Sequence, residues 1–235
     1  MNKTPSRITN PEVAAFLNKV AAMPSVRPAS ARQGRLIFAV DATASRQPAW
    51  DRACHLQAEM FLATRDLGGI AVQLAYWRGF QEFAATPFLT DAADLARRMS
   101  GVTVLGGQTQ LGRCLQHALN ETRRERVNAL VVVGDALEED VDAVCHLAGQ
   151  LGLHGCPVFC FQEGRERMAE LGFRQVAKLS GGAWAPFDTA SAETLRELLR
   201  AVAVFAAGGH AALTRLPGRA AAGIAGQLPA PAGRR

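Results

Sequence analysis

The sequence lacks the features that would mark it as a membrane, secreted or nucleic-acid-binding protein. No apolar stretch is long enough to span a membrane, and the first residues lack the apolar region of a secretory signal, so we expect a cytoplasmic protein. Aromatic residues make up only 6% of the 235 residues, and none is interleaved with a run of Lys and Arg. We therefore interpret the net charge of +5 as a solvated basic surface and expect no nucleic-acid partner, although the pI of about 9.3 keeps a nucleic-acid-associated domain as a third hypothesis.

The sequence also shows no sign of a disulfide framework, and it lacks two common functional motifs. The number of cysteines is odd, which favours reduced core thiols over a disulfide framework. They are Cys54, Cys114, Cys145, Cys156 and Cys160. Cys156 and Cys160 are four residues apart in an expected strand, and a two-cysteine metal site there is the alternative, although no His/Cys pair at zinc spacing supports it. The sequence contains neither a phosphate-binding G-x-x-x-x-G-K-[ST] motif nor the G-x-S-x-G motif of α/β-hydrolases.

The composition along the chain predicts one large domain with a segment on either side. Residues 1–33 are expected to hold a short helix over residues 11–22, beginning at Pro11, and a linker. Residues 34–207 form the domain. Residues 208–235 are rich in Gly, Ala and Pro and cannot build a core of their own, so we expect disorder from about residue 217.

Apolar runs and helical stripes alternate through the domain. The strands are predicted over residues 36–40, 70–77, 80–86, 127–134, 157–161 and 183–187. The helices are predicted over residues 48–65, 91–100, 111–124, 140–152, 165–179 and 191–206. This order predicts an α/β fold of the Rossmann-like, doubly wound kind, with a mostly parallel six-stranded sheet and helices on both faces. The hairpin formed by the second and third strands places one antiparallel strand at an edge.

Oxygen-bearing side chains follow the expected strands where ligands bind in such sheets. Asp41, Thr43 and Ser45 occupy alternate positions directly after the first strand, Thr109 precedes a helix, and Asp135 directly follows the strand over residues 127–134. The carboxyl ends of parallel strands meet at one edge of a sheet, so these five oxygens can converge. Two carboxylates and three hydroxyls suit a hard cation, Mg²⁺ first and Ca²⁺ or Mn²⁺ next, and disfavour zinc or copper.

Each of these signals has a simpler reading when it is taken alone. Ser45 suits the N-cap of the following helix, and an Asp after a buried strand is often a turn residue. An acidic cluster follows Asp135, and we interpret it as the first turn of a helix stabilised by the helix dipole rather than as a second ion site. The cluster consists of Glu138, Glu139, Asp140 and Asp142. The five histidines show no ligand spacing, and His117 is expected to pack in the core.

Taken together, the three segments resemble the metal-ion-dependent adhesion site of von Willebrand factor A-type domains. That family has a D-x-S-x-S loop after the first strand, which Asp41, Thr43 and Ser45 match, a threonine before a later helix, which Thr109 matches, and an aspartate after the fourth strand, which Asp135 matches.

The resemblance covers roughly residues 34–207 and is of the bacterial intracellular type. Thr43 stands where the family usually has serine, and its methyl group narrows the site. Ala42 and Ala44 stand where Gly and Ser are frequent, which makes the loop stiffer. These departures bear on the affinity and the choice of partner more than on metal binding itself.

What the resemblance implies is a protein-interaction module rather than an enzyme. A partner protein supplies an Asp or Glu oxygen to the bound cation, with Arg46, Gln47 and Gln108 as candidate contacts to that partner. Relatives of this type also suggest an adaptor that works beside an ATPase or a chaperone. The alternative is a metal-dependent hydrolase or phosphatase in which the same cation activates water, although we find no convincing general base beside it. The sequence does not indicate an oligomeric state.

Overall fold

The computed structural model describes residues 33–43, 58–187 and 192–229 of the chain. Six strands pair in the order β3-β2-β1-β4-β5-β6. They are β1 (Gly34–Asp41), β2 (Ile70–Arg78), β3 (Glu82–Ala85), β4 (Ala129–Gly134), β5 (Val158–Glu163) and β6 (Ala183–Phe187). Only β3 runs antiparallel, beside β2 at one edge, and the other pairs are parallel. This confirms the mostly parallel, six-stranded sheet with one antiparallel edge strand.

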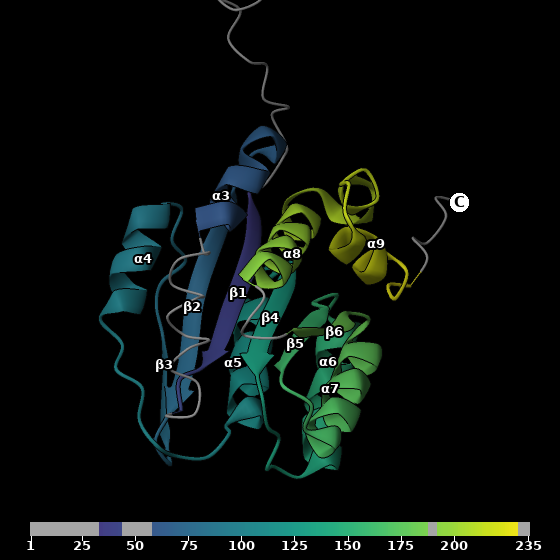
Figure 1. The fold of residues 1–235 in the computed structure, drawn as a ribbon. Helices are drawn as coiled ribbons and strands as arrows, with labels where there is room; N and C mark the ends of the chain where they lie inside the picture. The colour runs from purple at the N-terminus through teal and green to yellow at the C-terminus, as the bar shows by residue number, and fades with distance from the viewer. Residues whose placement is uncertain (1–32, 44–57, 188–191, 230–235) are drawn as a thin grey trace, which may run out of the picture. The chain divides into compact units, whose positions relative to one another are not determined.

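The helices pack on both faces of this sheet, as expected for a doubly wound fold (Figure 1). They are α3 (Ala58–Thr64), α4 (Ala92–Ser100), α5 (Leu111–Arg124), α6 (Val141–Leu153), α7 (Arg167–Ser180), α8 (Ala192–Leu213) and α9 (Arg219–Ala225), with a 3-10 turn, η2 (Arg65–Leu67), after α3. Helix α5 has the bounds that the sequence predicts. The other described helices of the domain begin or end within a few residues of the predicted bounds, apart from α8, which extends beyond residue 206.

The central strands are buried on both faces because their side chains alternate between two cores. In β1, Leu36, Phe38 and Val40 belong to the core under α3, α4, α8 and α9. Ile37 and Ala39 belong to the core under α5, α6 and α7. Continuous apolar runs such as these are what a parallel sheet covered by helices requires.

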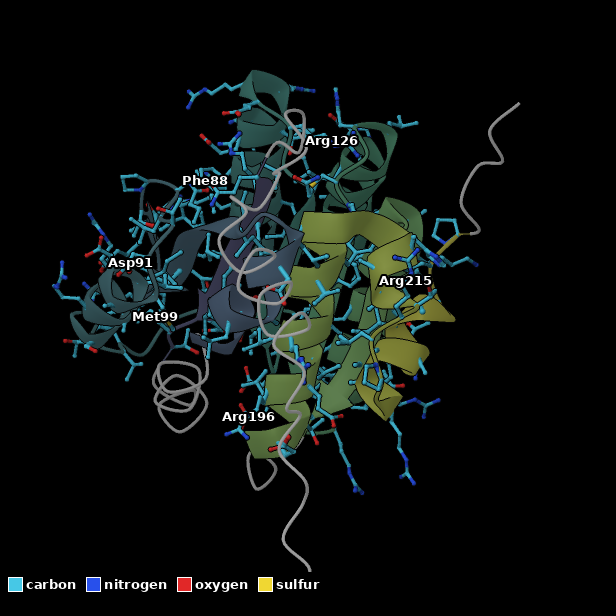
Figure 2. The ribbon with its side chains drawn as sticks, turned by 90° about the horizontal axis from the view of Figure 1, so that it is seen from above. Phe88, Asp91, Met99, Arg126, Arg196 and Arg215 are labelled. Atoms are coloured by element: carbon cyan, nitrogen blue, oxygen red, sulfur yellow. The ribbon has the colours of Figure 1, made fainter. Side chains whose placement is uncertain are left out.

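Helix α4 begins as the sequence predicts. The carboxylate of Asp91 accepts hydrogen bonds from the backbone N–H groups of Ala93 (2.9 Å) and Asp94 (3.0 Å), which caps the helix. Met99 is buried near the end of the same helix, and Figure 2 labels both residues on the side of the molecule away from Arg215.

The C-terminal segment differs from the expected disordered tail. Helix α8 runs to Leu213 with a kink at Gly209, whose φ of 70° suits glycine, and α9 follows. Ala221 and Ile224 of α9 are buried in the same core as α8. The expectation failed because two apolar side chains one helical turn apart are enough to dock a Gly/Ala-rich helix on a core that the rest of the domain supplies.

The expected N-terminal helix over residues 11–22 and most of the expected helix over residues 48–65 lie outside the described residues. In the part of the chain that is described, no helix is both long and apolar enough to cross a membrane.

Candidate metal site

The first part of the candidate site is the end of β1. Asp41 is the last residue of the strand and is 1% exposed, and Thr43 is buried two residues later. The backbone N–H of Thr43 donates a 2.8 Å hydrogen bond to Oδ1 of Asp41. Such a bond between an Asp and the residue two positions on stabilises a tight turn, so it keeps both side chains at the end of the strand.

Asp135 lies at the same edge because β1 and β4 are neighbours. Val40 of β1 pairs with Val133 of β4 in parallel register, so Asp41 and Asp135 follow paired positions by one and two residues. Asp135 is partly exposed, just beyond the end of β4. The order of the sheet reverses between β1 and β4, which is the point at which ligands bind in open α/β sheets.

Thr109 is bound to the loop that carries Asp135. Its hydroxyl oxygen accepts a 3.0 Å hydrogen bond from the backbone N–H of Glu138, and its own N–H donates a 3.0 Å bond to a carboxylate oxygen of Glu138. Thr109 is 8% exposed. This reciprocal pair brings Thr109 to the β4–α6 loop, although the two residues are 29 positions apart in the sequence.

Glu139 strengthens the same connection by capping α5. Its two carboxylate oxygens accept 2.7 Å hydrogen bonds from the N–H groups of Leu111 and Gly112, in the first turn of α5. Gln110, at the N-cap position, makes no side-chain cap bond of its own. A carboxylate from another loop therefore satisfies backbone donors that a helix normally satisfies locally.

The interpretation of the acidic cluster as the first turn of the next helix is confirmed for only two of its members. Asp140 is the N-cap of α6 and accepts a 2.8 Å bond from Ala143, and Asp142 lies in the first turn. It is wrong for Glu138 and Glu139, which precede the helix and bind the Thr109 segment. Local rules assign acids to the nearest helix, and no sequence signal shows which other loop comes close in space.

The segment between α4 and α5 contacts the other two loops at this edge as well. Leu105 donates a 3.1 Å backbone bond to the carbonyl of Ala42, and Gln108 donates a 3.2 Å backbone bond to the carbonyl of Gly79. A Cβ atom on Gly107 would lie 1.9 Å from the carbonyl oxygen of Gly79, so only glycine fits there. The loop that carries Thr109 is thus held between the β2–β3 turn and the β4–α6 loop.

Four of the five expected ligands therefore lie at one edge of the sheet: Asp41, Thr43, Thr109 and Asp135. Ser45 and the expected partner contacts Arg46 and Gln47 lie outside the described residues. The side chain of Gln108, the third expected contact, is exposed. The donor set fits a hard cation, because all of its side-chain donors are oxygens. Among the described residues, no three His, Cys, Asp or Glu side chains gather where they could hold a metal ion, so this set relies on hydroxyl oxygens beside its carboxylates.

The described cysteines are free thiols. Burial raises the pKa of Cys156 to about 12, and it also raises the pKa values of Cys114 and Cys160. Neutral thiols are poor nucleophiles and poor metal ligands. All three side chains are buried, so the expectation that they lie in the core is confirmed. His117 is half-buried, contacts Oε1 of Gln73 at 2.9 Å, and has a pKa that burial lowers.

No protein-family model and no curated protein matches the sequence, whereas many solved structures share its fold. A von Willebrand factor type A protein from Catenulispora acidiphila has a TM-score of 0.62 at 15% identity, covering 75% of this chain and 43% of that one. The SpRpn10 VWA domain has a TM-score of 0.57 at 10% identity, covering 70% of this chain and 95% of that one.

A third similar structure is proximal thread matrix protein 1 from the mussel byssus, with a zinc-occupied MIDAS motif. Its TM-score is 0.53 at 16% identity, covering 74% of this chain and 46% of that one. This chain therefore spans less than half of the Catenulispora and mussel proteins but corresponds to nearly all of an isolated VWA domain. At these identities the likeness establishes the fold alone, and the fold is that of von Willebrand factor A domains.

Proposed function

We propose that this protein is an interaction module that binds a carboxylate of a partner protein through a divalent cation, Mg²⁺. The observation that supports this most strongly is the meeting of Asp41, Thr43, Thr109 and Asp135 at the edge where β1 and β4 end side by side. Ser45 completes the proposed ligand set. VWA domains generally mediate protein interactions, so the fold and the donor chemistry point to the same function.

The proposed cation balances negative charge at a partly buried edge. Asp41 is buried and Asp135 is partly buried, and two carboxylates at such an edge repel each other more strongly than they would in water. Mg²⁺ favours six oxygen ligands and keeps some waters, which leaves a position for an outside carboxylate. The bound ion supplies the positive charge and fixed geometry that such a carboxylate requires. Gln108, together with Arg46 and Gln47, is proposed to contact the partner around that position.

We also propose that the module works in the cytoplasm as an adaptor to an ATPase or a chaperone system. The buried free thiols of Cys114, Cys156 and Cys160 support a reducing compartment. The adaptor role rests on the resemblance to intracellular members of the family.

Isothermal titration of Mg²⁺ into EDTA-treated protein tests the metal site. We expect wild-type protein to bind one ion, and Asp41→Ala and Thr109→Val to lose most of that affinity. Asp91→Asn is the matched control, because Asp91 caps α4 and takes no part in the proposed site. Absence of Mg²⁺ binding by the wild type, or unchanged binding by Asp41→Ala, would overturn the proposal.

Affinity capture from native lysate then tests the partner. Partners of the proposed kind are retained with Mg²⁺, released by EDTA, and not retained by Asp41→Ala. Retention that is insensitive to both treatments would contradict a role for the cation in recognition.

A further inference from the structure

We propose that Glu138 and Glu139 are positioning residues for the metal site. They hold Thr109 and the start of α5 against the loop that carries Asp135, so that two ligands from distant segments stay together without the cation. The inference rests on the proposed Mg²⁺ site and adds two residues that do not themselves bind the ion.

Three of the other described helices are capped locally, unlike α5. Helices α4, α6 and α7 are each capped by the residue directly before them, which is Asp91, Asp140 or Glu166. Helix α5 differs because its cap is the carboxylate of Glu139, which is 27 and 28 residues from the backbone donors that it binds. A local cap fixes only its own helix. This distant cap also fixes the position of α5 relative to the β4–α6 loop.

Two hydrogen bonds hold Thr109, one at its side chain and one at its backbone. Its hydroxyl oxygen accepts the N–H of Glu138, which restricts rotation of the side chain, and a hydroxyl oxygen still has a second lone pair for a metal ion. The N–H of Thr109 donates to the Glu138 carboxylate, so the backbone is held as well. Glu138 is only three residues after Asp135, and the two proposed ligands are therefore tied through a short piece of chain.

Because these ligands are already held together, binding of the ion costs less conformational entropy. Residues that orient metal ligands through hydrogen bonds commonly change metal affinity by about 10-fold to 100-fold when they are mutated. Glu138 and Glu139 also carry negative charge, which attracts a cation without any positioning. The experiment has to separate these two effects.

Mg²⁺ titration of four variants of the 235-residue chain separates them. Glu139→Gln keeps only one acceptor oxygen, so one of the two N–H groups of α5 loses its acceptor. Glu138→Ala removes the acceptor for the N–H of Thr109. We expect both variants to lower Mg²⁺ affinity by about 10-fold or more. Glu138→Gln removes the same charge but keeps an oxygen that accepts from Thr109, and we expect an affinity within about threefold of wild type.

Glu166→Gln is the matched control. Its carboxylate accepts bonds from the N–H groups of Met168 (2.9 Å) and Ala169 at the start of α7, so it removes the same kind of cap away from the site. Unfolding of all variants in EDTA measures the purely structural cost. We expect Glu166→Gln and Glu139→Gln to lose comparable stability, whereas only Glu139→Gln loses Mg²⁺ affinity.

The outcomes distinguish the two proposals. If the wild type binds Mg²⁺ and both Glu138→Ala and Glu139→Gln bind it equally well, the positioning role is wrong and the metal site stands. If Glu138→Gln loses as much affinity as Glu138→Ala, charge accounts for the effect and positioning is again wrong. If the wild type does not bind Mg²⁺, both proposals fail.

Discussion

Two edges of the sheet are each held by hydrogen bonds between residues that are far apart in the sequence, and the two sets of bonds differ in kind. At the carboxyl edge between β1 and β4, Thr109 is buried and bonded to Glu138, and Glu139 caps α5. At the outer edge, the backbone N–H of Trp184 in β6 donates to the side-chain amide of Gln227 (2.9 Å), which donates back to the carbonyl of Trp184 (3.0 Å).

The two contacts differ in charge and exposure, and this difference separates their roles. The bonds to Glu138 and Glu139 involve carboxylates at a partly buried place, where hydrogen bonds to ions are strong and sensitive to geometry. The amide of Gln227 is neutral and exposed, and it occupies one backbone position of an edge strand that would otherwise be open to other strands. The first contact joins two loops of the proposed site, and the second covers only one backbone position at the outer edge.

The largest expected effect concerns the outer edge. A chain that ends at Arg215, labelled in Figure 2, loses α9 and Gln227 and exposes the core that Ile224 covers. Burial of one large apolar side chain and its smaller neighbours is worth about 3 kcal/mol, so we expect a loss of that size and a midpoint lower by roughly 6–12 °C. Thermal unfolding by circular dichroism measures it.

Point variants of the 235-residue chain check that result. Ile224→Ala should reproduce most of the loss, whereas Ala222→Gln, on the exposed side of α9, should leave the midpoint within about 1–2 °C of wild type. An unchanged midpoint in both the shortened chain and Ile224→Ala would contradict docking of α9.

Much of the fold could be predicted because its signals are local. The apolar runs of β1 and β4 and the helical stripe of α5 each specify one element, and alternation of strands and helices then leaves a parallel sheet. The positions of four proposed ligands could be predicted for the same reason. Asp41, Thr43 and Asp135 lie at or just beyond the ends of buried strands, and Thr109 lies two residues before the start of α5.

The remainder depends on contacts that no local pattern specifies. Glu138 and Glu139 look like the start of their own helix until the approach of the Thr109 loop is known. The Gly, Ala and Pro content of the C-terminal segment is typical of disorder, so composition alone does not predict that it docks. A weak signal was present in Ala221, Ile224 and Leu228, which are spaced by three and four residues and contact one core.

A second prediction concerns whether α9 and the proposed metal site are independent. At an Mg²⁺ concentration 100 times the dissociation constant, binding to the folded state alone stabilises a protein by about 2.7 kcal/mol. We expect this increment in wild type and the same increment, within about 0.5 kcal/mol, in Ile224→Ala, because distant sites without shared partners are additive. Urea denaturation with Mg²⁺ or EDTA measures both. A much smaller increment in Ile224→Ala would show that docking of α9 and the metal site are coupled.

The smallest effect comes from Gln227 itself. Gln227→Ala removes two hydrogen bonds to Trp184, but both backbone groups then become accessible to water, so we expect a loss of only about 1 kcal/mol in urea denaturation. Gln227→Glu keeps an acceptor for the N–H of Trp184 and places a second acceptor against its carbonyl, so it should be no more stable than Gln227→Ala.

Along the open side of β6, the next residue after Trp184 whose backbone points outward is Pro186, two positions along, and proline has no N–H to donate. We therefore expect neither variant to associate through β6. Size-exclusion chromatography at increasing concentration checks this: new association by Gln227→Ala would mean that the amide of Gln227, rather than Pro186, protects this edge.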